Sequence, residues 1–255
     1  MPAANAPDPE IAPHPDPRQG VFETLLVTAG RPVELEAHLA RLAASLRALF
    51  AAAPPRETRH LVLERAAGLR LGRLRLGARP RRDGGLELEA RGEEVEPSIV
   101  FPVAGRGAAL VSLAVPGGLG AHKWSDRSLV ERAEAGAPAG SLALLRDGDG
   151  TVLEASRANV FAVRGGTIVT PPADGRILPG VARAVAIEVA RAAGLEVREE
   201  AIALAELTGV KEVFLTGSVR GVEPAGSLDG AELPPPGEVS RLLAAELRRR
   251  WFDGS

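Results

Sequence analysis

Several residue types are absent or rare in this 255-residue chain, and each absence narrows the possible chemistry. There is no cysteine, which excludes disulfides, cysteine nucleophiles and cysteine metal ligands. There is no tyrosine, and aromatic residues make up 3% of the chain, so the core must be built mainly from Leu, Val and Ala. No apolar run approaches the roughly 20 residues that a transmembrane helix needs. The net charge of −2 provides no basic surplus for nucleic acid or an anionic membrane.

Lysine is rare as well, because 2 lysines stand against 29 arginines. One of them, Lys123, follows the glycine-rich stretch 116–120. A desolvated ammonium can lose its proton and act as a nucleophile or base, whereas a guanidinium stays charged. Taken alone, Lys123 is more simply interpreted as a surface lysine. The first residues lack the basic start and apolar middle of a signal peptide, and with no cysteine this fits a cytoplasmic protein.

Hydrophobic periodicity predicts a mixed α+β protein, and the Pro- and Gly-rich stretch at 116–120 is the best candidate for a linker between two domains. Proline-rich residues 1–18 are expected to form a disordered tail. The rest is expected to form a small α/β domain (19–115), an interdomain linker (116–122) and a larger domain (123–255). Helices are expected at 36–52, 57–69, 125–135, 181–193 and 237–251. Strands are expected at 21–27, 33–35, 73–76, 86–89, 99–103, 109–115, 142–145, 152–154, 158–163, 167–170, 195–198, 212–215 and 219–222.

A few polar features could carry chemistry, and each alone also has a simpler structural interpretation. Pro179-Gly180 precedes a helix whose first N–H groups could bind an anion, but the pair is also an ordinary turn. Thr216-Gly217-Ser218 could bind phosphate or form a hairpin turn. Arg41 could contact phosphate or be a solvated helix arginine. Glu154 could hold a proton on a heterocycle or end a strand at the surface. Asn159 is expected to satisfy neighbouring backbone.

Other familiar sites are not supported. Asp147 and Asp149 flank glycines but lack the 12-residue loop and closing Glu of a Ca²⁺ site, so a turn is expected. The four histidines have no zinc spacing, and neither G-x-S-x-G nor a Walker sequence is present. No metal site is therefore expected.

Taken together, the rare lysine, a carboxylate, a helix N-terminus, a Thr-Gly-Ser turn and an arginine match what pyridoxal phosphate (PLP) requires. The order of these segments resembles the class-IV (fold type IV) PLP-dependent enzymes, over about residues 20–225. The matching segments are Gly20-Val21-Phe22-Glu23-Thr24, His38-Leu39-Ala40-Arg41-Leu42, His122-Lys123, residues 153–161, Leu178-Pro179-Gly180-Val181-Ala182-Arg183 and Phe214-Leu215-Thr216-Gly217-Ser218.

The resemblance implies a small α/β lobe beside a larger lobe with a barrel-like sheet, and PLP between them. It implies that Lys123 forms the Schiff base and that Glu154 partners the ring nitrogen. The phosphate would be held by Arg41, by the backbone of Val181 and Ala182, and by Ser218. Arg127, Arg157 and Arg220 are candidates for holding substrate carboxylates.

Within the family, the chain most resembles 4-amino-4-deoxychorismate lyase, which releases 4-aminobenzoate and pyruvate in the folate pathway. The transaminases usually carry a tyrosine shortly after the lysine, whereas Lys123, Asp126 and Arg127 fit the Lys-x-x-Asn/Asp-Arg pattern of the lyases. The shortened opening, Asp16-Pro17-Arg18-Gln19, resembles lyase modules fused behind an aminodeoxychorismate synthase component. A small-molecule substrate and a homodimer are implied. The alternatives are an aminotransferase for branched-chain or D-amino acids and, less favoured, a non-catalytic member.

Overall fold

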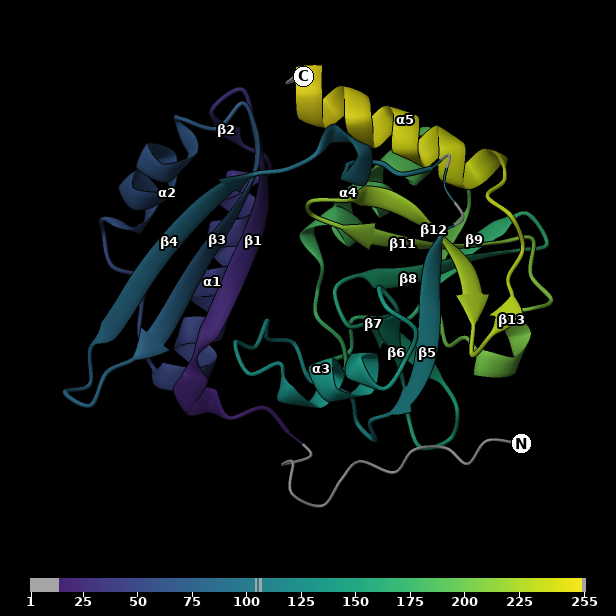
Figure 1. Cartoon of the computed structure of the whole chain (residues 1–255), viewed down its shortest axis with the longest axis horizontal. Helices are drawn as coiled ribbons and strands as arrows, with labels where there is room; N and C mark the ends of the chain where they lie inside the picture. The colour runs from purple at the N-terminus through teal and green to yellow at the C-terminus, as the bar shows by residue number, and fades with distance from the viewer. Residues whose placement is uncertain (1–13, 104, 106, 254–255) are drawn as a thin grey trace.

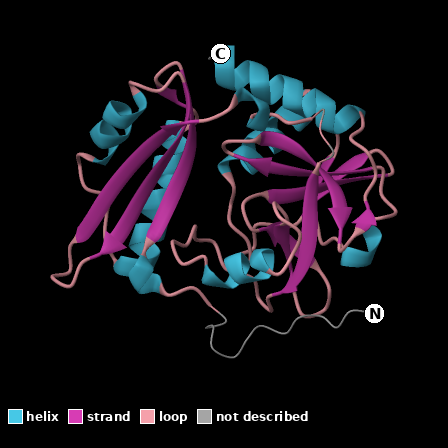
Figure 2. Ribbon diagram, viewed as in Figure 1, coloured by secondary structure: helices cyan, strands magenta, loops and turns pink. Residues whose placement is uncertain are grey.

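The computed structural model describes residues 14–103, 105 and 107–253 and shows two lobes, each built on its own β-sheet (Figure 1). The expected two-lobed α+β architecture is confirmed. In each lobe helices lie beside the sheet, as Figure 2 shows. The helices are α1 (Leu35–Phe50), α2 (Thr58–Ala66), α3 (Ser128–Ala135), α4 (Val181–Ala192) and α5 (Glu238–Asp253), with short 3-10 turns η1 (Pro17–Gln19), η2 (Pro97–Ile99) and η3 (Leu204–Glu206).

The smaller lobe is an antiparallel sheet with the strand order β2-β1-β3-β4. Its strands are β1 (Val21–Thr28), β2 (Arg31–Pro32), β3 (Leu71–Pro80) and β4 (Leu86–Glu94). Buried apolar residues alternate along β3, and one face of the sheet packs on α1 and α2 through a core that includes Leu25, Leu42 and Leu74. The other face of β1 is also buried, because Leu26 belongs to the core of the larger lobe. β1 therefore joins the two lobes.

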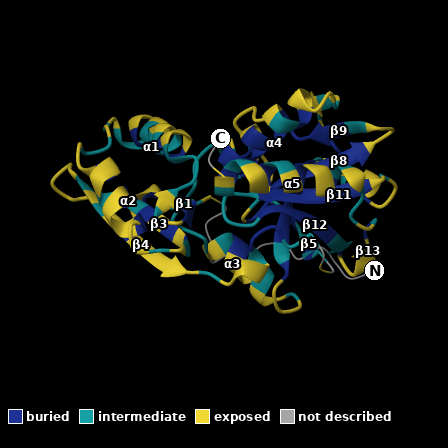
Figure 3. Cartoon of the chain, turned by 90° about the horizontal axis from the view of Figure 1, so that it is seen from above, coloured by how far each residue is buried: buried dark blue, intermediate teal, exposed yellow. Residues whose placement is uncertain are grey.

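The larger lobe is a nine-stranded sheet with the path β10-β9-β8-β11-β12-β5-β6-β7, to which β13 adds at β12. The strands are β5 (Ala108–Ala114), β6 (Leu142–Arg146), β7 (Val152–Ala155), β8 (Asn159–Arg164), β9 (Thr167–Thr170), β10 (Val197–Glu199), β11 (Glu212–Gly217), β12 (Gly221–Leu228) and β13 (Ala231–Glu232). β7 ends the path yet contacts β8, and Ala155 forms a bridge with Ala158 just before β8, so the sheet curls into the expected barrel-like form. α4 and α5 pack on β11 and β12, and the strands beneath them are buried (Figure 3).

The observed sheets shift the expected domain boundary. β5 was expected in the smaller domain, but it pairs in parallel with β6 and with β12 of the larger sheet. The chain therefore first passes from the smaller to the larger lobe in the segment that joins β4 to β5. The expected end of the smaller domain, at residue 115, does not match the sheets. These are pairings between distant segments, which local patterns cannot select.

Two other local expectations differ from the structure. Residues 99–103 do not form a strand, because Pro97 and Pro102 lack a backbone N–H and Phe101 has a positive φ of 53°. The second short strand lies at 31–32 rather than 33–35. Of the expected disordered tail, residues 1–13 lie outside the described residues, whereas η1 is ordered and the Asp16 N–H donates to Asp126. Within the described ranges, no helix has the length and apolarity to cross a membrane.

Candidate active site

A cavity of about 980 Å³ lies between the two lobes. Its walls come from β1, β3 and β4 of the smaller lobe, and from β7, β11 and the start of α4 in the larger lobe. The cavity brings together all the residues that the sequence singled out for cofactor and substrate: Arg41, Lys123, Arg127, Glu154, Arg157, Val181, Ala182, Ser218 and Arg220. The second lysine, Lys211, is exposed and lies outside the cavity.

Lys123 is held by backbone pairing with the start of β1. Its carbonyl accepts the Phe22 N–H over 2.9 Å, and the Ser125 N–H donates to the Gly20 carbonyl over 3.0 Å. The Lys123 amine lies 5.0 Å from the centre of the Phe22 ring. Desolvation, with a further contribution from the Arg41 charge, lowers the pKa of Lys123 to about 8. A larger fraction of this amine is therefore neutral near neutral pH than in a solvated lysine.

The residues on either side of Lys123 are anchored as well. His122 Nδ1 lies 3.0 Å from Ser45 Oγ on α1. The Trp124 indole N–H donates to the Leu119 carbonyl over 2.7 Å, and its ring meets His122 edge to face. The lysine is therefore presented from a fixed backbone. The sequence placed Lys123 in a loosened stretch, and only the structure shows these contacts.

Glu154 lies near the end of β7, lines the cavity and is buried. The Leu178 N–H donates to its Oε2 over 3.2 Å. Burial raises the pKa of Glu154 to about 8, although the Leu178 N–H and the Lys123 charge oppose this shift. A buried carboxyl in this position can share a proton with a heterocyclic nitrogen. The alternative of a surface carboxylate at a strand end is therefore wrong.

The N-terminus of α4 opens into the cavity. Among the described residues no side chain caps this helix, and its first bond within the helix runs from the Ala184 N–H to the Gly180 carbonyl. The N–H groups of Val181 and Ala182 therefore have no acceptor within the helix. Thr216 pairs across the sheet with Asn159, whose side chain lies against Gly180, and its buried Oγ1 has no hydrogen-bond partner among the described residues. Orphaned donors of both kinds at one place suit a phosphate group, and Ser218 follows in the adjoining turn.

Arg41 reaches this region from α1, but its guanidinium is partly engaged. Nε and Nη2 donate to the two oxygens of Glu23, over 2.9 and 2.6 Å. Nη1 donates to the Pro179 carbonyl over 3.1 Å. The buried Glu23 also meets His38 Nδ1 over 2.7 Å. Burial favours a raised pKa for Glu23, but the Arg41 charge and the His38 hydrogen bond outweigh it and lower the pKa to about 2.

The three arginines proposed to bind substrate carboxylates differ in whether a carboxylate of the protein already pairs with them. Arg220 is paired with Glu223, and Arg157 is paired with Glu134 over 2.8 Å and is mostly exposed. Arg127 donates to the Ser156 carbonyl rather than to a carboxylate, and it is partly buried. Arg127 is therefore better placed than the other two to receive an anion.

Sequence reasoning assigned no role to three residues that shape this site: Glu23, His38 and Arg75. Glu23 pairs with Arg41, and His38 contacts Glu23. Arg75, on the cavity face of β3, stacks over the Phe22 ring with 3.7 Å between its guanidinium carbon and the ring centre. The alternation of arginine with leucine in β3 was a usable signal, because it puts Arg73 and Arg75 on one face.

Asn159 has the structural role expected of it. Its side-chain amide donates to the Leu178 carbonyl over 3.0 Å, and it pairs across the sheet with Thr216. Its Oδ1 would lie 1.9 Å from a Cβ placed on Gly180. Gly180 is therefore required by a close approach, and it seats the start of α4 against β8.

Comparisons with known proteins agree with this geometry. The sequence profile of the family described as Amino-transferase class IV matches residues 20–101 and 109–228. A putative branched-chain-amino-acid aminotransferase from Methanocaldococcus jannaschii is 34% identical over 114 residues, which cover 43% of this chain and 40% of that protein. The branched-chain-amino-acid aminotransferase of Escherichia coli is 34% identical over 87 residues, which cover 34% and 28%. The matches thus span less than half the length of these curated relatives.

Solved structures match over nearly the whole chain. A hypothetical aminotransferase from Mycobacterium tuberculosis, in a PLP-bound form, superposes with a TM-score of 0.80 at 25% identity, covering 100% of this chain and 95% of that one. A 4-amino-4-deoxychorismate lyase from Pseudomonas aeruginosa has a TM-score of 0.76 at 29% identity, covering 95% and 96%. Because the family profile covers well over half of the sequence, this chain belongs to the class IV aminotransferase family.

Proposed function

We propose that this protein binds PLP in the interlobe cavity and is a lyase that converts 4-amino-4-deoxychorismate to 4-aminobenzoate and pyruvate. The observation that favours the lyase reaction is the set of arginines that line the cavity with Lys123. Arg75 and Arg127 reach the cavity from separate elements, on β3 and before α3, and neither forms a bidentate ion pair with another described residue. The proposed substrate carries two carboxylates, and arginine is the side chain best suited to bind a carboxylate at each end.

The residues present fit PLP. The open N-terminus of α4, the orphaned Thr216 hydroxyl and Ser218 would hold the phosphate, and Arg41 would add positive charge. Glu154 would share its proton with the ring nitrogen, and Lys123 would supply the attached amine. When bound, PLP supplies an electrophilic carbonyl for amines and an electron sink for a carbanion.

The chain's own residues would then carry the proton transfers. Lys123, with its pKa lowered to about 8, would remove the proton from the amine-bearing ring carbon of the substrate. The bond from the neighbouring ring carbon to the enolpyruvyl oxygen then breaks, and the ring becomes aromatic. The departing enolpyruvyl group takes up a proton and leaves as pyruvate. Arg75 and Arg127 would hold the two carboxylates so that the proton lies within reach of Lys123.

An aminotransferase for branched-chain or D-amino acids is the second candidate. The specific observation in its favour is that the curated relatives are named as branched-chain aminotransferases. It would use Lys123 for proton transfer in the same cavity, with a 2-oxo acid as the second substrate. The absence of any tyrosine in the chain disfavours it, since the transaminases resembled here carry one after the lysine.

The test follows 4-aminobenzoate and pyruvate together after adding 4-amino-4-deoxychorismate to the PLP-loaded protein. The lyase predicts equal amounts of both products without a 2-oxo acid. Conversion of the bound cofactor to pyridoxamine phosphate by an amino acid donor, with no 4-aminobenzoate formed, would establish the aminotransferase instead. Protein that takes up no PLP would refute both and support a non-catalytic member.

The proposal also covers the oligomeric state and the cellular location of the protein. By family resemblance, two copies would pair as a homodimer in the cytoplasm, with a functional link to an aminodeoxychorismate synthase component. Light scattering of the purified protein would report a single mass of twice 26.5 kDa if the copies pair. A mass of one chain at working concentration contradicts the dimer.

A further inference from the structure

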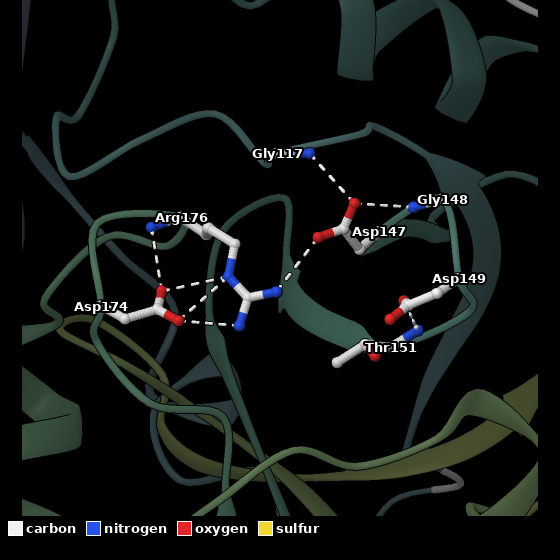
Figure 4. A network of polar contacts seen from close by, with 7 residues as sticks. All are labelled: Gly117, Asp147, Gly148, Asp149, Thr151, Asp174 and Arg176. Carbon is white, nitrogen blue, oxygen red and sulfur yellow. Dashed lines mark hydrogen bonds and ion pairs between the residues drawn. The ribbon is translucent and has the colours of Figure 1, made fainter.

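Two carboxylates, those of Asp147 and Asp174, bind the Arg176 guanidinium in the loop before α4 (Figure 4). Arg176 is not among the residues that line the cavity. Its Nε and Nη2 donate to Asp174, with 2.7 Å from Nη2 to Oδ2. Its Nη1 donates to Asp147 Oδ2 over 3.0 Å. Asp147 belongs to the turn between β6 and β7, which the sequence treated only as a turn. The guanidinium therefore ties this turn to the loop that leads into α4.

Arg176 also holds the glycine-rich linker that precedes Lys123. The other oxygen of Asp147 accepts the Gly117 N–H over 3.1 Å, and the carbonyl of Arg176 accepts the Gly120 N–H over 3.3 Å. A Cβ on Gly118 would lie 2.0 Å from that carbonyl, so the linker passes against the backbone of residue 176. Positive φ angles at Gly117, Gly118 and Gly120 also require glycine there.

The loop that contains Arg176 continues directly into the rest of the site. Two residues later, Leu178 donates to Glu154 and accepts from Asn159. Pro179 then accepts from Arg41, and α4 begins after Gly180. The linker runs the other way, reaching Lys123 three residues after Gly120. Residue 176 therefore joins the segment that leads to the Lys123 amine to the loop whose Leu178 N–H binds the Glu154 carboxyl.

From these contacts we infer that Arg176 is a positioning residue that sets the Lys123 segment against Glu154 and the N-terminus of α4. It acts through Asp147 and through its own carbonyl, and it does not touch the cavity. The inference deepens the proposed function and rests on it only for the identity of the ligand, PLP. Without the guanidinium, Asp147 loses its cationic partner and the linker loses the clamp that keeps Gly117 on that carboxylate.

The first measurement uses hydrogen exchange in the cofactor-free full-length protein. Arg176→Ala should speed exchange of the amides in residues 117–122 at least about tenfold, while amides in the core strand β8 stay protected. Arg164→Ala is the matched control, because Arg164 is also held between two glutamates, Glu200 and Glu206, but at the far end of β8. Linker exchange unchanged in Arg176→Ala, or equally raised in Arg164→Ala, overturns the inference.

The second measurement is the dissociation constant for PLP. We expect it to rise about tenfold in Arg176→Ala and to stay within about twofold of the wild type in Arg164→Ala. Arg176→Lys keeps a cation that can reach one carboxylate, so it should fold and give an intermediate value in both measurements. A wild-type dissociation constant in Arg176→Ala, or a Lys variant as impaired as the Ala variant, contradicts the positioning role. If PLP binds but no 4-aminobenzoate forms, the lyase fails while the exchange result still decides the role of Arg176.

Discussion

Nη2 of Arg41 lies 2.6 Å from Oε2 of Glu23, in a bidentate pair that joins α1 to β1 beneath the cavity. The pair is nearly sealed from solvent, because the exposed fractions of the two side chains are 9% and 2%. His38 completes the cluster on the Glu23 side. An ion pair at such depth contributes to folding only while both charges are present.

Loss of the Glu23 charge should therefore destabilise the protein. In Glu23→Gln, Arg41 stays buried without its counter-charge, so the free energy of unfolding at pH 7 should fall by about 3 to 5 kcal/mol. Denaturant unfolding measures this change. Glu64→Gln, at an exposed position on α2, is the matched control and should change stability by less than about 0.5 kcal/mol.

The same pair predicts an acid dependence of stability. The pKa of Glu23 is lowered to about 2, so its contribution is complete above the ordinary glutamate pKa and is lost as the pH falls towards 2. A shift from 4.5 to about 2 corresponds to about 3 kcal/mol. Unfolding at pH 3 and pH 6 should show a smaller gap between wild type and Glu23→Gln at pH 3. A gap that does not narrow would contradict this pKa.

The two lysines should behave in opposite ways. Lys123→Ala should abolish turnover and the covalent fixation of PLP by borohydride, because no other lysine lines the cavity among the described residues. Lys211→Ala should leave both unchanged, since Lys211 is exposed elsewhere. Peptide mass mapping of the reduced protein locates the modified lysine. Fixation that survives in Lys123→Ala would overturn the assignment of the site.

The attachment of PLP to cofactor-free protein should follow the protonation of Lys123. The neutral amine is the nucleophile, and desolvation lowers its pKa to about 8, so the rate should rise with pH and level off above about 8. Glu154 favours the charged amine, so Glu154→Gln should move the midpoint to lower pH. Stopped-flow absorbance across this pH range measures the midpoint. A midpoint near that of a free lysine, about 10.4, would show that the amine is solvated.

Gly180 should tolerate no side chain while Asn159 is present. In Gly180→Ala the new Cβ meets Asn159 Oδ1, which should displace the start of α4 and raise the dissociation constant for PLP about tenfold or more. The double variant with Asn159→Ala removes the collision and should recover part of the loss. Gly209→Ala, where the new Cβ makes an ordinary contact of 3.6 Å, is the control. Two purely additive losses in the double variant would contradict a direct collision.

Local patterns predicted many of the elements because their causes are local. The β3–β4 hairpin alternates apolar and charged residues around Asp83-Gly84-Gly85, and α4 begins after Pro179-Gly180 as expected. The positions of β5 and of residues 99–103 were not predictable in this way. β5 joins β6 and β12 by parallel pairing, and residues 99–103 leave the strand conformation at a proline and a positive φ.

The sequence by itself determined which side chains are available: one lysine in a glycine-rich stretch, a carboxyl at the end of a strand, a bare helix N-terminus and no tyrosine. These follow from residue type and short-range spacing. Only the tertiary structure decided that Arg41 forms an ion pair with Glu23, that Arg75 reaches the cavity and that Arg176 holds the linker before Lys123. Those relationships join residues distant in the chain, and they exist only once packing has buried the charges and fixed the backbone between them.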